Sequence, residues 1–195
     1  MRIYIRHADK QYSNGHATAC SHDPSITEDG YIKTLMLGEN LIKRWGFPDY
    51  IVCSPYRRTR ETAEALAKVV RDRGGNEIIV KYEIRLSEYL GNHRDRNLDV
   101  NEITSLCNPP HPENFFQMDS RVRYHNDEMR ELDYQNINVW FVTHGFIINR
   151  LGNAMGYKLP RRMPYLGSAI FSGDKNETIC HLLINDKLEL MPPKS

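Results

Sequence analysis

Short runs of β-branched and other apolar residues alternate along the chain with longer segments of mixed polarity. Four of these runs have the length of buried strands: residues 3–5, 50–53, 78–80 and 137–142. Amphipathic segments at 28–44 and 55–73 separate the first three runs, and Gly46 and Gly74 follow these segments, as is typical of helix ends. The order strand, helix, strand, helix, strand predicts an α/β fold, a three-layer αβα sandwich with a mostly parallel central sheet.

Single residues indicate where both helices start and which face each one buries. Thr27 is the expected N-cap of a first helix that runs to about Arg44. Ser54 and Pro55 are the expected N-cap and first residue of the second helix. Small or apolar residues recur at helical spacing, at Leu35, Gly38, Ile42 and Trp45 in the first helix and at Ala63, Leu66, Ala67 and Val70 in the second.

The regular alternation stops in an insertion at about residues 89–136. Three prolines within 109–112 exclude regular structure at its centre, and short helices are expected on either side, at 99–106 and 117–132. An insertion of this kind commonly forms a lid or a wall that faces the substrate. A structural excursion that never touches substrate is the alternative.

The last part of the chain predicts the remaining core elements. A helix at 146–155 follows the fourth apolar run. Residues 168–172 and 178–184 indicate an antiparallel hairpin at one edge of the sheet, with a turn at 173–176. No repeat or linker divides the chain, so residues 1–195 are expected to form a single domain.

Composition excludes several classes of protein. The net charge of +1 gives no overall attraction to nucleic acid or membranes, and no apolar run approaches the roughly 18 residues of a membrane span. The N-terminus reads as a core strand rather than a secretory signal. The four cysteines are too scattered for a zinc or redox motif: Cys20, Cys53, Cys107 and Cys180. We therefore expect a cytoplasmic protein with reduced thiols, no metal and no cofactor.

Charged and reactive side chains follow the predicted strands. Arg6 and His7 end the first strand, Glu88 follows the third, and His144 follows the fourth. The turn after the second strand carries Arg58. Because the carboxyl ends of parallel strands gather at one edge of a sheet, these groups are expected to face one crevice that attracts an anion. Each group alone also has an ordinary interpretation as a solvated surface residue, but four such coincidences at one edge are much rarer.

A set of spaced motifs carries a resemblance to a known family. Arg-His near the N-terminus is followed by Asp-Pro-x-x-Thr-x-x-Gly at 23–30, Ser-Pro-x-x-Arg-x-x-x-Thr-Ala at 54–63, Leu-Ser-Glu at 86–88 and Thr-His-Gly at 143–145. In this order they closely resemble the histidine phosphatase superfamily, the phosphoglycerate-mutase-like proteins, over residues 1 to about 156. Glu88-Tyr89 and Met163-Pro-Tyr-Leu-Gly167 are similar to the branch of the suppressors of T-cell-receptor signalling and the insect ecdysteroid-phosphate phosphatases.

The resemblance implies a phosphomonoester hydrolase that forms a phosphohistidine on His7. Glu88 would act as general acid and then as general base, kept protonated by burial and by the charge of the substrate, with Asp9 as the second choice. Arg58 is preferred over Arg57 because it lies four residues after Ser54, as in the family pattern. The groups that would surround the phosphoryl group, as catalytic or phosphate-binding residues, are Arg6, Lys10, Arg58 and His144.

Two departures from the family pattern bear on the activity. Ala8 replaces the usual glycine after the nucleophilic histidine. The Gly-Glu-Ser-x-Trp-Asn run of the mutases is absent, which argues against phosphoglycerate mutase activity. The other alternative is a catalytically weak phosphate-recognition or scaffold module. The complete set of nucleophile and acid argues against it, since a binder needs neither.

The substrate and the partners stay open at this point. A phosphorylated small molecule or a phosphoprotein is the expected partner, and a homodimer is considered, although the sequence does not determine the oligomeric state. Four aromatic residues could line a pocket for phosphotyrosine or a steroid phosphate, or form the core of a lid: Tyr89, Phe115, Phe116 and Tyr124. Four arginines are more typical of a solvated surface than of a nucleic-acid site: Arg94, Arg96, Arg121 and Arg123.

Overall fold

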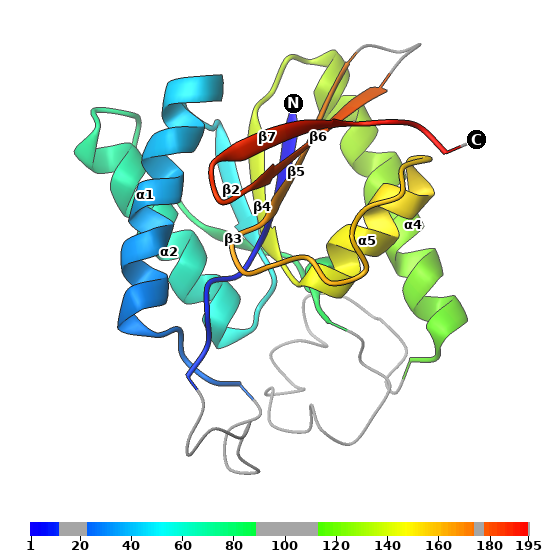
Figure 1. Ribbon diagram of the computed structural model, residues 1–195, viewed down its shortest axis with the longest axis horizontal. Coiled ribbons are helices and arrows are strands. Elements are labelled where there is room, and N and C mark those ends of the chain that lie inside the picture. Colours follow the sequence, from blue (N-terminus) through cyan, green and yellow to red (C-terminus); the bar gives the residue numbers. More distant parts are fainter. Residues whose placement is uncertain (12–22, 89–112, 174–177, 195) are drawn as a thin grey trace.

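A computed structural model describes residues 1–11, 23–88, 113–173 and 178–194 (Figure 1). Its strands are β1 (Arg2–Arg6), β2 (Tyr50–Cys53), β3 (Lys81–Tyr82), β4 (Val139–Thr143), β5 (Ser168–Gly173), β6 (Thr178–Ile184) and β7 (Lys187–Met191). Within the described residues they form one sheet in the order β3-β2-β4-β1-β5-β6-β7. The first four of these are parallel and the last three pair antiparallel, which confirms the mostly parallel sheet with an antiparallel side.

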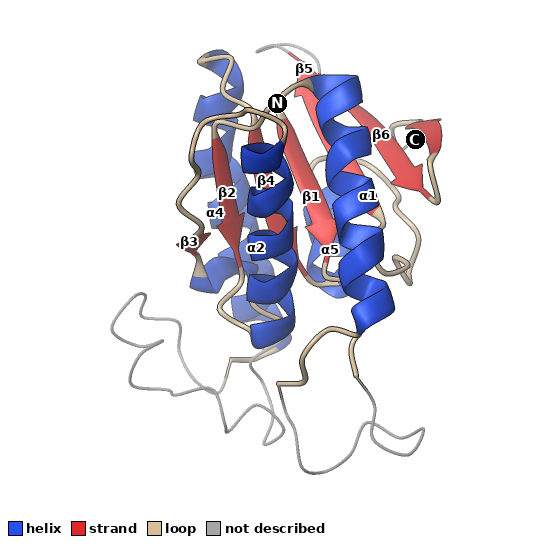
Figure 2. Ribbon diagram, turned by 90° about the vertical axis from the view of Figure 1, so that its left-hand side faces the viewer, coloured by secondary structure: helices blue, strands red, loops and turns tan. Residues whose placement is uncertain are grey.

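Helices cover both faces of the sheet, which confirms the three predicted layers. α1 (Glu28–Trp45) and α2 (Arg57–Asp72) pack on one face, and α4 (Phe115–Tyr134) and α5 (Gly145–Ala154) pack on the other (Figure 2). Each face has its own apolar core.

Alternation along the central strands supplies both cores. In β1, Ile3 and Ile5 pack beneath α1 and α2, whereas Tyr4 between them joins the core beneath α4 and α5. In β4, Trp140 packs beneath α1 and α2, whereas Phe141 packs beneath α4 and α5. Both strands are buried on two sides, which explains why they read as unbroken apolar runs.

The first helix begins as predicted, and most of its predicted face packs in the core. The Thr27 hydroxyl accepts a hydrogen bond from the Gly30 N–H at 2.9 Å, which is the expected N-cap. Thr34, Leu37, Gly38 and Leu41 are buried, and the partly buried Ile42 and Trp45 pack against the same core, whereas Leu35 is only partly buried. At Gly38 the helix approaches α2 closely, since an added Cβ would lie 3.1 Å from Cβ of Val69.

The second helix begins later than predicted. Its N-cap is Tyr56 rather than Ser54, and its first helical residue is Arg57. The Ser54 N–H still belongs to the sheet, since it donates to the Val142 carbonyl at 3.0 Å. The predicted stripe is buried at all four positions: Ala63, Leu66, Ala67 and Val70.

Both edges of the sheet differ from the prediction. The third strand lies at Lys81–Tyr82 and not at 78–80, where Ile79 is 79% exposed. It pairs only with the last two residues of β2, so the sheet is short at this edge. At the other edge, β7 was not predicted. Asn185 and Asp186, with φ of 47° and 64°, join it to β6 in a two-residue hairpin, so the β5–β6 hairpin is internal.

Part of the predicted insertion is a core helix. α4 extends the helix expected at 117–132, and its residues Met118 and Val122 pack in the core against the sheet. The helix expected at 99–106 lies outside the described residues, as does the turn at 174–176. A lid between residues 89 and 112 therefore stays a prediction.

Backbone hydrogen bonds continue beyond the strand ends and bring the following loops together. The His7 N–H donates to the Thr143 carbonyl at 2.9 Å. The Glu83 N–H donates to the Cys53 carbonyl at 2.8 Å, just before the 3₁₀ turn η1 (Ile84–Leu86) that leads to Glu88. The residues after β1, β2, β3 and β4 consequently meet at one edge of the sheet, where α/β proteins place their ligands.

Candidate active site

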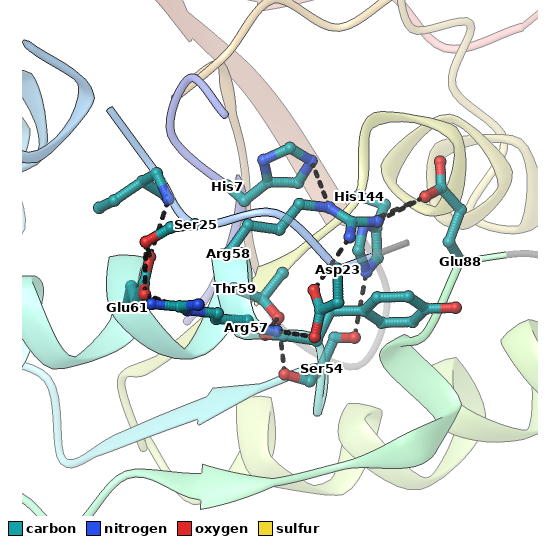
Figure 3. Close-up of polar contacts among 12 residues, drawn as sticks. His7, Asp23, Ser25, Ser54, Arg57, Arg58, Thr59, Glu61, Glu88 and His144 are labelled. Atoms are coloured by element: carbon teal, nitrogen blue, oxygen red, sulfur yellow. Dashed lines mark hydrogen bonds and ion pairs between the residues drawn. The ribbon is translucent and has the colours of Figure 1, made fainter. Parts of the chain in front are cut away.

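Arg58 lies at the centre of the groups at this edge (Figure 3). It belongs to the first turn of α2, and its side chain is only 3% exposed. Its Nε donates to Nε2 of His7 at 3.3 Å, and its Nη2 donates to Nδ1 of His144 at 3.3 Å. The same Nη2 lies 2.7 Å from Oε2 of Glu88, and Nη1 lies 3.3 Å from Oδ1 of Asp23. One buried guanidinium thus contacts three of the predicted site residues.

The hydrogen bonds of His7 define its neutral tautomer. Its Nδ1 lies 2.8 Å from the carbonyl oxygen of Ala8, and a carbonyl can only accept, so Nδ1 carries the proton. Nε2 therefore keeps its lone pair, which points at the Nε–H of Arg58. Burial and, secondly, the charge of Arg58 hold the pKa of His7 well below its usual range. The ring is neutral near pH 7, with the free nitrogen facing the cations.

His144 has the opposite tautomer. Its Nδ1 accepts from Arg58, so its Nε2–H donates to the Ser54 hydroxyl at 3.0 Å. The residue is fully buried, and burial followed by the charge of Arg58 lowers its pKa well below the usual range. The centroids of the His144 and His7 rings are 5.3 Å apart in an edge-to-face arrangement. Both rings therefore flank the same small space.

Glu88 lies at the open side of this space. Its side chain is 46% exposed, so the expectation that it is buried is wrong. Glu88 ends a turn at the sheet edge, where solvent reaches it, and it meets Arg58 as an ion pair. Its Oε2 lies 3.7 Å from Nδ1 of His144.

Arg6 is held in place by the segment that follows α5. Its guanidinium lies 3.9 Å from the centroid of the Tyr165 ring, and its Nη1 donates to the Met163 carbonyl. Tyr165 also packs against His7, with ring centroids 5.6 Å apart. The positive charges of Arg6 and Lys10 both contribute to the low pKa of His7, so both cations act on this site.

The sequence prediction missed several supporting residues. Asp23 accepts from the Arg57 backbone N–H at 2.6 Å as well as contacting Arg58, and burial raises its pKa. Ser54 was interpreted as a helix cap, yet its hydroxyl binds His144. Both residues lie inside the quoted motifs, so motif membership was the available signal. Tyr165 lies in the similar Met163–Gly167 segment, but nothing there indicated a contact with Arg6.

Other predicted groups lie elsewhere. Phe115, Phe116 and Tyr124 are 56%, 79% and 59% exposed on α4, and both alternatives for them, a substrate pocket or a lid core, stay predictions. Arg121 is buried, not a solvated surface residue as interpreted, because it pairs with Glu113. Tyr89, Arg94 and Arg96 fall outside the described residues.

Within the part of the chain that the structure describes, no helix combines the length and apolar character needed to cross a membrane. No group of three or more histidine, cysteine, aspartate or glutamate side chains in the described ranges could hold a metal ion.

The family model of the histidine phosphatase superfamily, branch 1, matches residues 3–166. The chain belongs to this superfamily. The match confirms the resemblance found in the motifs, and it contains His7, Arg58, Glu88 and His144.

Solved structures of histidine phosphatases and related proteins share the fold. A mycobacterial glucosyl-3-phosphoglycerate phosphatase is 20% identical, with a TM-score of 0.59 over 99% of this chain and 98% of that one. The ecdysone phosphate phosphatase from Bombyx mori, solved with tungstate, is 14% identical, with a TM-score of 0.69 over 100% of this chain and 94% of that one. A search among curated protein sequences finds no match. Family and fold together support a phosphatase.

Proposed function

We propose that the protein is a phosphomonoester hydrolase in which His7 is transiently phosphorylated. The observation that carries this proposal is the neutral His7 ring, whose Nδ1–H is engaged by the Ala8 carbonyl and whose Nε2 lone pair faces Arg58. A nucleophile needs that lone pair, and an anionic substrate needs the cations around it. A site that only bound phosphate would need no neutral imidazole there.

A phosphate dianion would take over the donors that now serve other residues. Arg58 presents its guanidinium to His7, His144 and Glu88, and each of these contacts can be exchanged for a phosphoryl oxygen. Arg6 adds a second guanidinium, with a buried Nε that has no partner among the described residues. Lys10 adds a point charge. These cations would neutralise the equatorial oxygens of the transferring group.

The first half-reaction transfers the phosphoryl group to the protein. Nε2 of His7 attacks phosphorus, an N–P bond forms, and the P–O ester bond breaks with its electron pair going to the leaving oxygen. Glu88 gives that oxygen a proton. The substrate favours the protonated acid, because phosphate displaces Arg58 from the carboxyl and puts negative charge beside it.

The second half-reaction releases phosphate. The Glu88 carboxylate takes a proton from water, the water oxygen bonds to phosphorus, and the P–N electron pair returns to Nε2 of His7. His144 would stabilise both transfers, since a nearby dianion favours its protonated, donating form. Asp9 stays the second choice for the acid; its backbone carbonyl accepts from the Thr27 N–H at 2.8 Å, a bond that supports the loop.

The proposed substrates are phosphorylated small molecules or phosphoproteins of the cytoplasm, with phosphotyrosine or a steroid phosphate first among them. The ring of Tyr165 beside His7 supports an aromatic or polycyclic alcohol as leaving group. The fold shared with the ecdysone phosphate phosphatase is a second support. A phosphate-binding module with weak turnover is the second candidate, favoured by the Arg58–Glu88 ion pair that substrate must break.

Trapping the intermediate tests the proposal. The protein is mixed with p-nitrophenyl phosphate, quenched in alkali, which preserves phosphohistidine, and mapped by mass spectrometry. We expect phosphate on His7, loss of turnover in His7→Ala, and unchanged turnover in His181→Ala, a histidine on β6 that serves as the matched control. Phosphate on another residue, or turnover that survives His7→Ala, would refute the mechanism.

A further inference from the structure

Arg121 is a buried arginine whose hydrogen bonds go to the turn that carries Glu88. It lies on α4, on the opposite face of the sheet from Arg58, and its side chain is 7% exposed. Its Nη1 donates to the carbonyl oxygens of Arg85 at 2.7 Å and Ser87 at 3.0 Å. Its Nη2 lies 3.5 Å from the carbonyl oxygen of Glu88 itself. The mechanism proposed above does not use this residue.

A carboxylate holds Arg121 from the other side. Nε and Nη2 donate to the two oxygens of Glu113 at 3.0 Å and 2.5 Å, a bidentate pair. The Glu113 side chain is 1% exposed. A bidentate pair fixes the plane of the guanidinium, so the donors that face residues 85–88 are fixed as well.

The acid depends on its backbone for its position. The Glu88 side chain is 46% exposed, and its contacts at the site are with Arg58 and His144, which substrate would displace. The turn is tied to β4 by the Thr143 hydroxyl, which donates to the Leu86 carbonyl at 2.6 Å. Arg121 binds the carbonyls on either side of that point, at residues 85 and 87. The turn is therefore held at three successive carbonyls.

We propose that Arg121, oriented by Glu113, is a positioning residue that holds the general acid Glu88 over the leaving oxygen. This inference rests on the proposed function. General acid catalysis requires hydrogen-bond reach between the acid and the leaving oxygen, and small misplacements reduce it strongly. Arg121 itself touches no reacting atom. Among the steps that kcat/KM reports, a variant that keeps the charge but misplaces Glu88 slows the transfer to His7, where the leaving oxygen needs the proton.

The dependence on the leaving group separates positioning from general damage. A poor leaving group such as phenol needs the proton, whereas 2,4-dinitrophenolate departs almost without it. We expect Arg121→Lys, which keeps the charge but loses the planar fork, to lower kcat/KM for phenyl phosphate at least ~10-fold. With 2,4-dinitrophenyl phosphate the change should stay within about twofold. Arg123→Lys, an exposed arginine on the same helix, should match wild type on both substrates.

Double variants complete the test. In the Glu88→Gln background, Arg121→Lys should add no further loss with phenyl phosphate, because the acid is already absent. If Arg121→Lys folds poorly, the paired variant Arg121→Met with Glu113→Leu removes both charges together and should show the same selective loss. Equal losses on both substrates, or no loss on either, would overturn the positioning role. If Glu88→Gln itself shows no leaving-group dependence, the proposed function fails instead.

Discussion

A buried histidine away from the site offers a clear test of how this protein responds to acid. His125 of α4 is 1% exposed, and its Nε2 lies 3.2 Å from the hydroxyl of Tyr4 beneath the sheet. Burial lowers its pKa to about 3, against the smaller opposing effect of the Glu83 charge. In the unfolded chain the same ring has a pKa of about 6.5. The perturbation is His125→Gln, whose amide can still bond to the Tyr4 hydroxyl but cannot take up a proton.

Proton uptake by the unfolded chain determines whether stability rises or falls with pH. Below pH 6.5 the unfolded chain binds a proton at residue 125 and the folded protein does not, so the folded state loses stability as the pH falls. The loss is about 1.4 kcal/mol for each pH unit, or ~2 kcal/mol between pH 6.5 and pH 5. It continues until the pH approaches the folded pKa. His7 and His144, whose pKa values are also lowered, add losses in the same direction.

Urea unfolding between pH 7 and pH 5 measures this effect. Wild type should lose stability steeply below pH 6.5, and the His125→Gln variant should lose ~2 kcal/mol less by pH 5. Each protein's free energy of unfolding at pH 5 is compared with its own value at pH 7. A packing defect in the variant that does not depend on pH therefore cancels. Parallel slopes for the two proteins would refute the reasoning, because they would mean that His125 takes up its proton in the folded state.

Two further predictions concern single hydroxyl groups. Ser54→Ala removes the acceptor for the buried Nε2–H of His144, which should lower stability by roughly 1–3 kcal/mol in urea unfolding. It should also lower kcat on the order of 10-fold, whereas unchanged turnover would show that the tautomer of His144 does not matter. Thr27→Ala removes the N-cap of α1 and should lower the free energy of unfolding by about 1 kcal/mol. Thr27→Ser retains the hydroxyl and should be as stable as wild type. Equal losses of stability in both variants would contradict the capping role.

Much of the layered fold could be predicted because its signals are local. Buried parallel strands produce unbroken apolar runs, and the stripe at Ala63, Leu66, Ala67 and Val70 has helical spacing whatever surrounds it. The predictions are wrong where packing between distant segments determines the structure. α1 packs closely against α2 at Gly38, and β3 forms where the chain pairs with Val52 and Cys53 of β2, contacts between segments that residue type does not predict. Ser54 is a typical helix cap by residue type, but its N–H bonds to the Val142 carbonyl in the sheet and its hydroxyl bonds to His144.

The sequence alone determined which reactive groups this protein has and that they follow neighbouring strands, because strand order and residue type are written along the chain. Only the tertiary structure decided how those groups meet. The Ala8 carbonyl determines the tautomer of His7 and the Arg58 guanidinium that of His144, and Arg58 lies between these two rings, which are 137 positions apart in the chain. The sequence likewise could not show that Glu88 is exposed and Arg121 buried, because solvent access depends on which distant segments pack nearby.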